Sequence, residues 1–223
     1  MMKKRNWILA AFLLSTSMVA LAQKSAEEPK GKAIVQVFGN FHSGFGHAND
    51  DRGFELDRSY LGYQYDLGHG LEVKGVMDIG QSDDVNDFHR IAYIKNAQIS
   101  WKTGKWTLTG GLISNTQFNV QEKFWGYRYV MKSFQDLYKF GNSADLGVSV
   151  AYKFANWISA DAIVVNGEGY KKVQKNDGLM YGLGTTLTPA ECITMRVYDG
   201  LNESADETKK DVENLATFIG RTL

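Results

Sequence analysis

The 223-residue sequence predicts an all-β fold, a transmembrane antiparallel up-and-down β-barrel with about ten strands in this chain. Three observations support this prediction. Apolar and polar residues alternate with a period of two along most of the chain, which indicates strands with one apolar face. Short and long connections alternate between these segments, as they do in membrane barrels. The first residues also have the pattern of an export signal.

Residues 1–22 are predicted to be a cleavable signal peptide. Lys3, Lys4 and Arg5 form a positive start, and an uncharged, mostly apolar run of about 14 residues follows. A membrane-spanning helix needs about 20 such residues, so an anchor is the weaker interpretation. Ala20-Leu21-Ala22 supplies small residues before the expected cut. We therefore expect export, a periplasmic N-terminal segment at 23–32 and a barrel at 33–223.

The composition excludes several classes of protein. Loss of the signal leaves 22 of the 25 Lys and Arg against 25 Asp and Glu, a net charge near −3, which gives no indication of nucleic-acid binding. The single Cys192 allows no internal disulfide and no cysteine-rich zinc site. No segment suggests a nucleophile paired with a base. We therefore expect no enzyme activity, no cofactor and no metal.

The alternation defines ten predicted strands. It is clearest in 144–154, where Leu146, Val148 and Val150 face one way and Asp145 and Ser149 the other. It is imperfect in 90–101, where Lys95 falls on the apolar face. The predicted strands are 33–46, 53–66, 71–80, 90–101, 106–115, 144–154, 157–166, 177–188, 193–200 and 214–221.

The connections predict which end of the barrel faces which compartment. Short turns lie at 67–70, 102–105, 155–156 and 189–192, and aromatic residues gather beside them, as in an interfacial girdle. The longer connections are 47–52, 81–89, 116–143, 167–176 and 201–213. This pattern places the mature N-terminus and the short turns in the periplasm. The alternative is a soluble periplasmic β-sandwich, which explains the loop asymmetry poorly.

The connection 116–143 is unusually rich in aromatic and basic side chains. An exposed loop does not normally carry so many large rings, so we expect it to fold back into the barrel, with a short helix at about 121–138. Its formal charge is near +2. Two interpretations of its cations stay open: they favour anions in the lumen, or they pair with acids such as Asp145 and Glu122 and hold the loop in place.

Several segments resemble the phosphate-selective porin O/P-like family, in particular its version in Bacteroidetes. They are Phe54-Glu55-Leu56-Asp57-Arg58-Ser59-Tyr60-Leu61-Gly62-Tyr63, the hairpin from Leu67 to Gly75 with Asp78, Glu122-Lys123-Phe124-Trp125-Gly126-Tyr127-Arg128, Ala144-Asp145-Leu146-Gly147 and Asn166-Gly167-Glu168-Gly169-Tyr170. These motifs are short, but the similarity extends over most of the mature chain.

This resemblance implies an outer-membrane porin, often of about sixteen strands and trimeric, whose third loop constricts the channel. By position, it proposes Arg58, Lys123, Arg128 and Lys132 as candidate anion-interacting residues of the constriction. The chain has few arginines after the signal, which counts against specificity for phosphate. The implied partners are small hydrophilic solutes or anions, together with outer-membrane lipid and lipopolysaccharide.

The function expected from these observations is passive diffusion of small hydrophilic solutes or ions. Alternatives are a non-conducting barrel plugged by its third loop, with a structural or surface-binding role, and a truncated remnant of a sixteen-stranded porin. A ten-stranded barrel hardly has room for an infolded loop and a channel, and the tail Phe218-Ile219-Gly220-Arg221-Thr222-Leu223 lacks a terminal aromatic residue. Both points favour an incomplete barrel.

Overall fold

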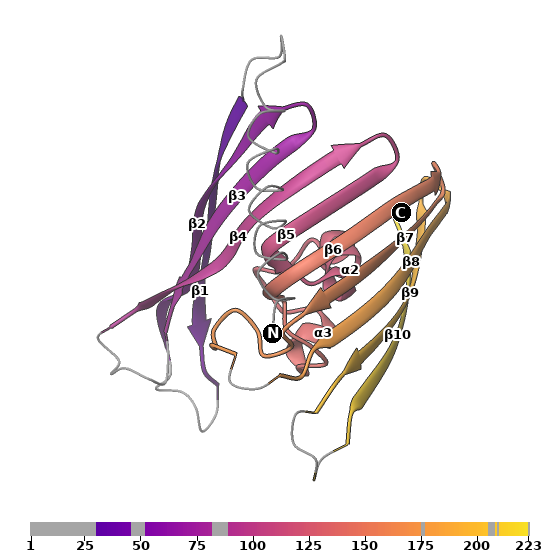
Figure 1. Ribbon diagram of the computed structural model, residues 1–223. Helices are drawn as coiled ribbons and strands as arrows, with labels where there is room; N and C mark the ends of the chain where they lie inside the picture. Colours follow the sequence, from indigo (N-terminus) through magenta and orange to yellow (C-terminus); the bar gives the residue numbers. More distant parts are fainter. Residues whose placement is uncertain are drawn as a thin grey trace, which may run out of the picture.

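The computed structural model describes residues 30–45, 52–81, 89–174, 177–204, 208 and 210–222. The predicted signal peptide, 1–22, lies outside the described residues. Ten strands and two short helices make up the described fold (Figure 1). The strands are β1 (Lys30–Ser43), β2 (Arg52–Gly68), β3 (Leu71–Gly80), β4 (Ile91–Thr103), β5 (Trp106–Ser114), β6 (Ala144–Ala155), β7 (Ile158–Val165), β8 (Met180–Ala190), β9 (Ile193–Asn202) and β10 (Val212–Arg221), and the helices are α2 (Thr116–Trp125) and α3 (Phe134–Leu137).

The strands form one antiparallel sheet in which each strand pairs with its neighbours in sequence. This confirms the predicted all-β, up-and-down architecture and its ten strands. Four hairpins close with two-residue turns, at 69–70, 104–105, 156–157 and 191–192, and the longer connections gather at the opposite end of the sheet (Figure 1). The first strand begins at Lys30, three residues before its predicted start.

The sheet is strongly curved but it is not closed. Its order runs from β1 to β10, and within the described residues these two edge strands have no partner on their outer sides. The closed barrel predicted from the sequence is therefore not what the structure shows. The sheet instead forms a trough with a convex outer face and a concave inner face (Figure 1).

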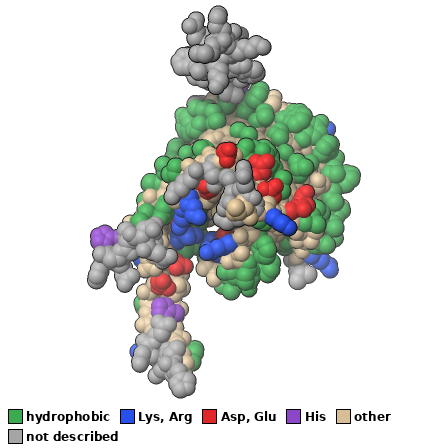
Figure 2. Space-filling view, turned by 60° about the horizontal axis from the view of Figure 1, so that its bottom comes forward, with side chains coloured by type: hydrophobic (Ala, Val, Ile, Leu, Met, Phe, Trp, Pro, Cys, Tyr) green, Lys and Arg blue, Asp and Glu red, His purple; other side chains and the backbone are tan. Residues whose placement is uncertain are grey.

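The convex face is apolar across the whole sheet. Every second residue of most strands is a large apolar side chain that faces outward and remains exposed, for example Val148 at 58% and Leu183 at 64%. Figure 2 shows these hydrophobic side chains around the rim of the molecule, with charged side chains gathered toward its middle. Among the described residues, no helix is long and apolar enough to cross a membrane.

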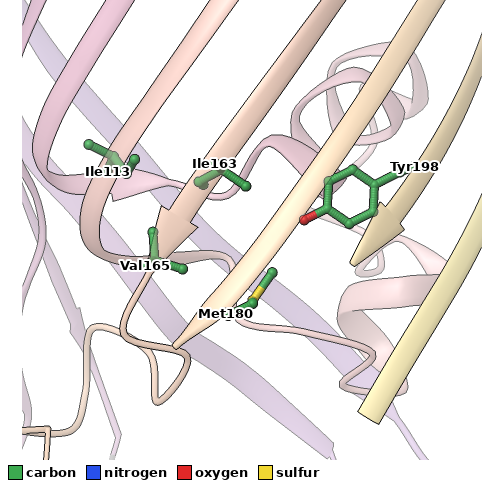
Figure 3. Close-up of a cluster of buried hydrophobic side chains, with 5 residues drawn as sticks. All are labelled: Ile113, Ile163, Val165, Met180 and Tyr198. Carbon is green, nitrogen blue, oxygen red and sulfur yellow. The ribbon is translucent and has the colours of Figure 1, made fainter. Parts of the chain in front are cut away.

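The concave face is mostly polar over β2 to β5, although Tyr60 and Val76 form a small apolar cluster there with Phe38 of β1. A second apolar cluster lies near the long connections. Ile113, Ile163, Val165, Met180 and Tyr198 are buried against one another there (Figure 3). This differs from the uniformly polar inner face that the alternation predicts. The side chains on that face of β7 change from Ser159 and Asp161 to Ile163 and Val165 as the strand passes beneath the residues that follow β5.

Residues 115–143, which link β5 to β6, fold back over the concave face, and we call them the infolded connection. Helix α2 begins at Thr116, and the side chain of the preceding Asn115 caps it by accepting a hydrogen bond from the Gln117 N–H. Phe118 is buried at 1% exposure, and α2 contacts β7, β8 and β10. The sequence predicts one helix at about 121–138, whereas the chain forms two shorter ones.

A buried arginine attaches this connection to the wall of the trough. Arg196 on β9 donates to both carboxylate oxygens of Asp161 on β7, each at 2.8 Å, and to the Thr116 carbonyl at 3.0 Å. Gly184 leaves the space in which the guanidinium lies, because a Cβ there would come within 2.2 Å of Nη2. The polar pair thus joins β7, β9 and the first turn of α2.

Candidate functional site

A large cavity lies at the end of the trough that carries the long connections. Its volume is about 860 Å³, and it is lined by β2, by the infolded connection, by the segment after β7 and by β8, β9 and β10. Six basic side chains line it, against the carboxylates of Asp136, Glu168 and Glu213. The basic residues are Arg58, Arg128, Lys132, Lys139, Lys171 and Lys172.

Three of the four candidate residues from the sequence meet at this cavity. Arg58 on β2 and Arg128 and Lys132 on the infolded connection line it, and all three also line a smaller cavity of about 400 Å³ beside it. Lys123, the fourth candidate, lies exposed on α2 and lines neither cavity. The structure therefore brings Arg58, Arg128 and Lys132 together and leaves Lys123 apart.

Arg58 belongs to a network of polar groups on the concave face. Its Nε lies 3.2 Å from Oδ1 of Asp78 on β3, a carboxylate that is only 1% exposed, and its Nη1 donates to the Tyr60 hydroxyl at 3.4 Å. Lys95 donates to the same hydroxyl at 2.7 Å, and its ammonium lies 4.2 Å from the centre of the Tyr60 ring. Two cations and one acid therefore share this part of the wall.

A β-bulge brings Lys95 into this network. The register of β4 on β3 passes from Asn96 opposite Val76 to Ile94 opposite Met77, so that Lys95 is the extra residue. Ile94 faces outward, while Lys95 and Asn96 both lie on the inner side. Lys95, which breaks the predicted alternation, thus faces inward. The break in the pattern was the sequence feature that indicated its unusual position.

Arg128 is held by acids of its own connection. Its guanidinium lies 3.0 Å from Asp136 and 3.7 Å from Glu122, and also 6.0 Å from the centre of the Phe38 ring on β1. Burial and the nearby Asp136 carboxylate raise the pKa of Glu122 above that of an ordinary glutamate, although Arg128 opposes the shift. For Arg128, this geometry agrees with the interpretation that loop cations pair with loop acids.

The lysines of the cavity have fewer acidic neighbours than its two arginines. Within the described residues, no carboxylate lies within ion-pair distance of Lys132, Lys139, Lys171 or Lys172. Lys171 and Lys172 were not among the candidates from the sequence, because their segment reaches the other basic residues only through the tertiary fold. Their one sequence signal is their position directly after the segment Asn166 to Tyr170.

Asp145, the other acid expected to pair with a loop cation, has a different role. It is buried at the start of β6 and accepts hydrogen bonds from the Gly167 and Gly169 N–H groups at 2.7 and 2.9 Å. Its carboxylate therefore shapes the segment that follows β7 and does not neutralise a cation of the infolded connection.

Comparison with known proteins adds no family to this description. The chain matches no protein-family model, and no curated protein is significantly similar to it in sequence. Its function must therefore be argued from the sheet and the cavity themselves.

Proposed function

We propose that this chain forms the wall of an outer-membrane porin, through which small hydrophilic solutes or ions diffuse passively, with a preference for anions. One observation carries the proposal: the ten-stranded sheet is apolar on its exposed convex face and polar on most of its concave face. Water-soluble proteins do not normally expose apolar surface this extensive. In a bilayer, the same arrangement presents apolar side chains to lipid and polar ones to an aqueous lumen.

The charge around the cavity supports the preference for anions. Six basic side chains face three acidic ones there, and fixed positive charge in a narrow aqueous passage lowers the cost for an anion to enter. Because Arg58 and Arg128 are already paired with acids, the lysines supply most of the charge that remains for a passing ion.

The proposal has consequences for location and partners. The protein would be exported after cleavage of residues 1–22, would contact outer-membrane lipid and lipopolysaccharide, and would assemble as a homotrimer. Lipid does not tolerate unpaired backbone groups, so the outer edges of β1 and β10 must both be paired in the membrane. The strands that pair with them would complete the wall of the channel.

The test is single-channel conductance of the refolded protein in a planar bilayer under a salt gradient. Discrete current steps are expected, and the sign of the reversal potential should show that anions carry more current than cations. Heat-dependent migration in gels would establish beforehand that the protein is folded. Membrane-inserted, folded protein that gives no steps would contradict the proposal.

A second candidate is a barrel that does not conduct because its lumen is plugged. The observation in its favour is that the infolded connection lies over the concave face, where its own Phe118 is buried and α2 contacts β7, β8 and β10. Deletion of residues 121–139 should then convert closed, membrane-inserted protein into a conducting form. A deletion variant that folds and stays closed would count against this candidate.

A further inference from the structure

The segment after β7, residues 166–174, crosses the trough, and we call it the strap. Its base is fixed to the start of β6: Asp145 accepts from two strap N–H groups, and the Tyr170 N–H donates to the Ala144 carbonyl at 3.0 Å. Asn142 also donates to the Gly167 carbonyl at 2.6 Å. The strap therefore leaves the sheet in a defined direction.

The tip of the strap reaches the opposite side of the trough. The Tyr170 hydroxyl donates a hydrogen bond to Oδ2 of Asp78 on β3, and its ring packs edge-on against Tyr93 of β4, with the ring centres 6.5 Å apart. Strands β3 and β7 are separated by three strands, about 19 Å along a sheet with 4.8 Å spacing. Figure 1 shows this segment running back from β7 across the concave side.

The contact between Tyr170 and Asp78 also changes the charge that faces the cavity. Arg58 occupies one oxygen of Asp78 and Tyr170 the other, so this carboxylate is covered. The next residue, Lys171, lies with its ammonium 4.6 Å from the centre of the Tyr93 ring, and Lys171 and Lys172 both line the cavity. The hydrogen bond from Tyr170 therefore covers the Asp78 carboxylate, and it also holds the neighbouring Lys171 and Lys172 at the cavity.

We propose that the strap is a second constriction of the channel, separate from the infolded connection, with Tyr170 as the residue that clasps it to Asp78 and Lys171 as a residue that determines selectivity. We call the hydrogen bond between Tyr170 and Asp78 the clasp. The effect of the strap on ions rests on the proposed porin function, but the clasp itself does not. Burial and the neighbouring Asp78 carboxylate raise the pKa of Tyr170, so its hydroxyl remains a donor even at pH values at which an ordinary tyrosine ionises.

The clasp can be tested without any measurement of transport. A nitroxide spin label is attached at Val173, which is 80% exposed, in a Val173→Cys, Cys192→Ser background. We expect the lines of the spectrum to narrow when Tyr170→Phe removes only the clasping hydroxyl, because the backbone of the strap then moves more freely. Tyr181→Phe, on the convex side of β8, is the matched control and should leave the spectrum unchanged. No narrowing with Tyr170→Phe would overturn the clasp.

The effect on ions is measured on the same variants by conductance. Tyr170→Phe should raise the single-channel conductance and lower the anion-to-cation permeability ratio, by about 2- to 3-fold for each unit of charge displaced from the passage. Lys171→Gln should lower that ratio while leaving the spin-label spectrum unchanged. Unchanged ratios in both variants would refute the role in selectivity. A parent protein that forms no channels would instead refute the porin proposal, and the spin label would still decide the clasp.

Discussion

The basic side chains of the concave face differ in how much of their charge is neutralised by neighbouring acids. Arg58 lies against Asp78, and Arg128 lies between Asp136 and Glu122. An ion pair of this kind presents little net charge at a distance. Protonation of an acid in such a pair would restore the charge of the arginine, which makes Glu122 the residue through which pH should act on selectivity.

If the chain forms the proposed channel, the raised pKa of Glu122 predicts that anion preference increases as the pH falls. Loss of one negative charge about 7 Å from a passing ion in water changes its energy by about 0.6 kcal/mol, or about 2- to 3-fold in the permeability ratio before screening. Glu122→Gln should show this higher ratio already at pH 7 and a weaker dependence on pH. Reversal potentials at low salt, where screening is weakest, measure both effects.

The same shift predicts the direction of a change in stability. The folded protein holds the Glu122 proton more tightly than the unfolded chain does. The resulting stabilisation is present at pH values below the ordinary glutamate pKa and is lost as the pH rises through the raised one. Equal pH dependence in the parent protein and in Glu122→Gln would show that another acid controls the response.

Between elements, the buried pair of Arg196 and Asp161 holds the infolded connection on the sheet. The guanidinium is only 4% exposed and bonds to β7, to Thr186 on β8 and to the first turn of α2. A buried ion pair adds little when compared with a well-packed apolar pair, but removal of one partner leaves an uncompensated charge. The attachment should therefore be sensitive to single substitutions and tolerant of a double one.

Arg196→Met is expected to lower the free energy of unfolding by about 3 kcal/mol, the lower end for a broken buried pair, because it leaves the Asp161 carboxylate, which is only 14% exposed, without its cation. Arg196→Met with Asp161→Leu should recover most of that loss. Urea unfolding of the protein in lipid, followed by tryptophan fluorescence, measures both variants. A double variant as unstable as the single one would show that the stability depends on the hydrogen bond to α2 and not on the buried charge.

The strands follow from the sequence because a period of two is a local property. Strand β6 was predicted at 144–154 and spans Ala144–Ala155, and β3 matches its predicted range, 71–80. The inward position of Lys95 could not be predicted, because a single bulged residue shifts the phase of the alternation. The burial of Ile163 and Val165 on the concave face could not be predicted either. The pattern does not distinguish an apolar side chain that faces outward from one that faces inward beneath a folded-back connection.

The candidate site was predictable only in part. The abundance of rings in 116–143 indicated that this connection folds inward and packs its rings on the wall. The connection does fold inward, but most of its rings stay exposed, for example Tyr129 at 61% and Phe134 at 62%. Arg58 and Lys132 meet because the connection returns to β2, but Lys171 joins them through the contact of Tyr170 with Asp78, which spans 92 residues of sequence. A contact at that separation leaves no periodicity in the chain, so no local pattern can reveal it.

At the scale of the whole molecule, the sheet exposes large apolar side chains on its convex face and carries polar ones on much of its concave face, which is the reverse of a soluble fold. Val148, near the middle of β6, is on the exposed convex face, whereas Gln98, at nearly the same level on β4, is partly buried on the concave face. If the convex face contacts lipid, a charge at Val148 is transferred out of water on insertion, and a charge at Gln98 is not.

Val148→Arg should therefore lower the free energy of unfolding from bilayers by about 2–4 kcal/mol, the cost of an arginine near the bilayer midplane. Gln98→Arg, the matched control on the concave face, should change it by no more than about 0.5 kcal/mol, as is usual for a side chain in contact with water. A soluble sandwich predicts the reverse order, because its concave face would be the core and its convex face would be in water. The ranking of the two variants in one unfolding experiment thus decides which solvent the sheet is built for, whether or not the protein conducts.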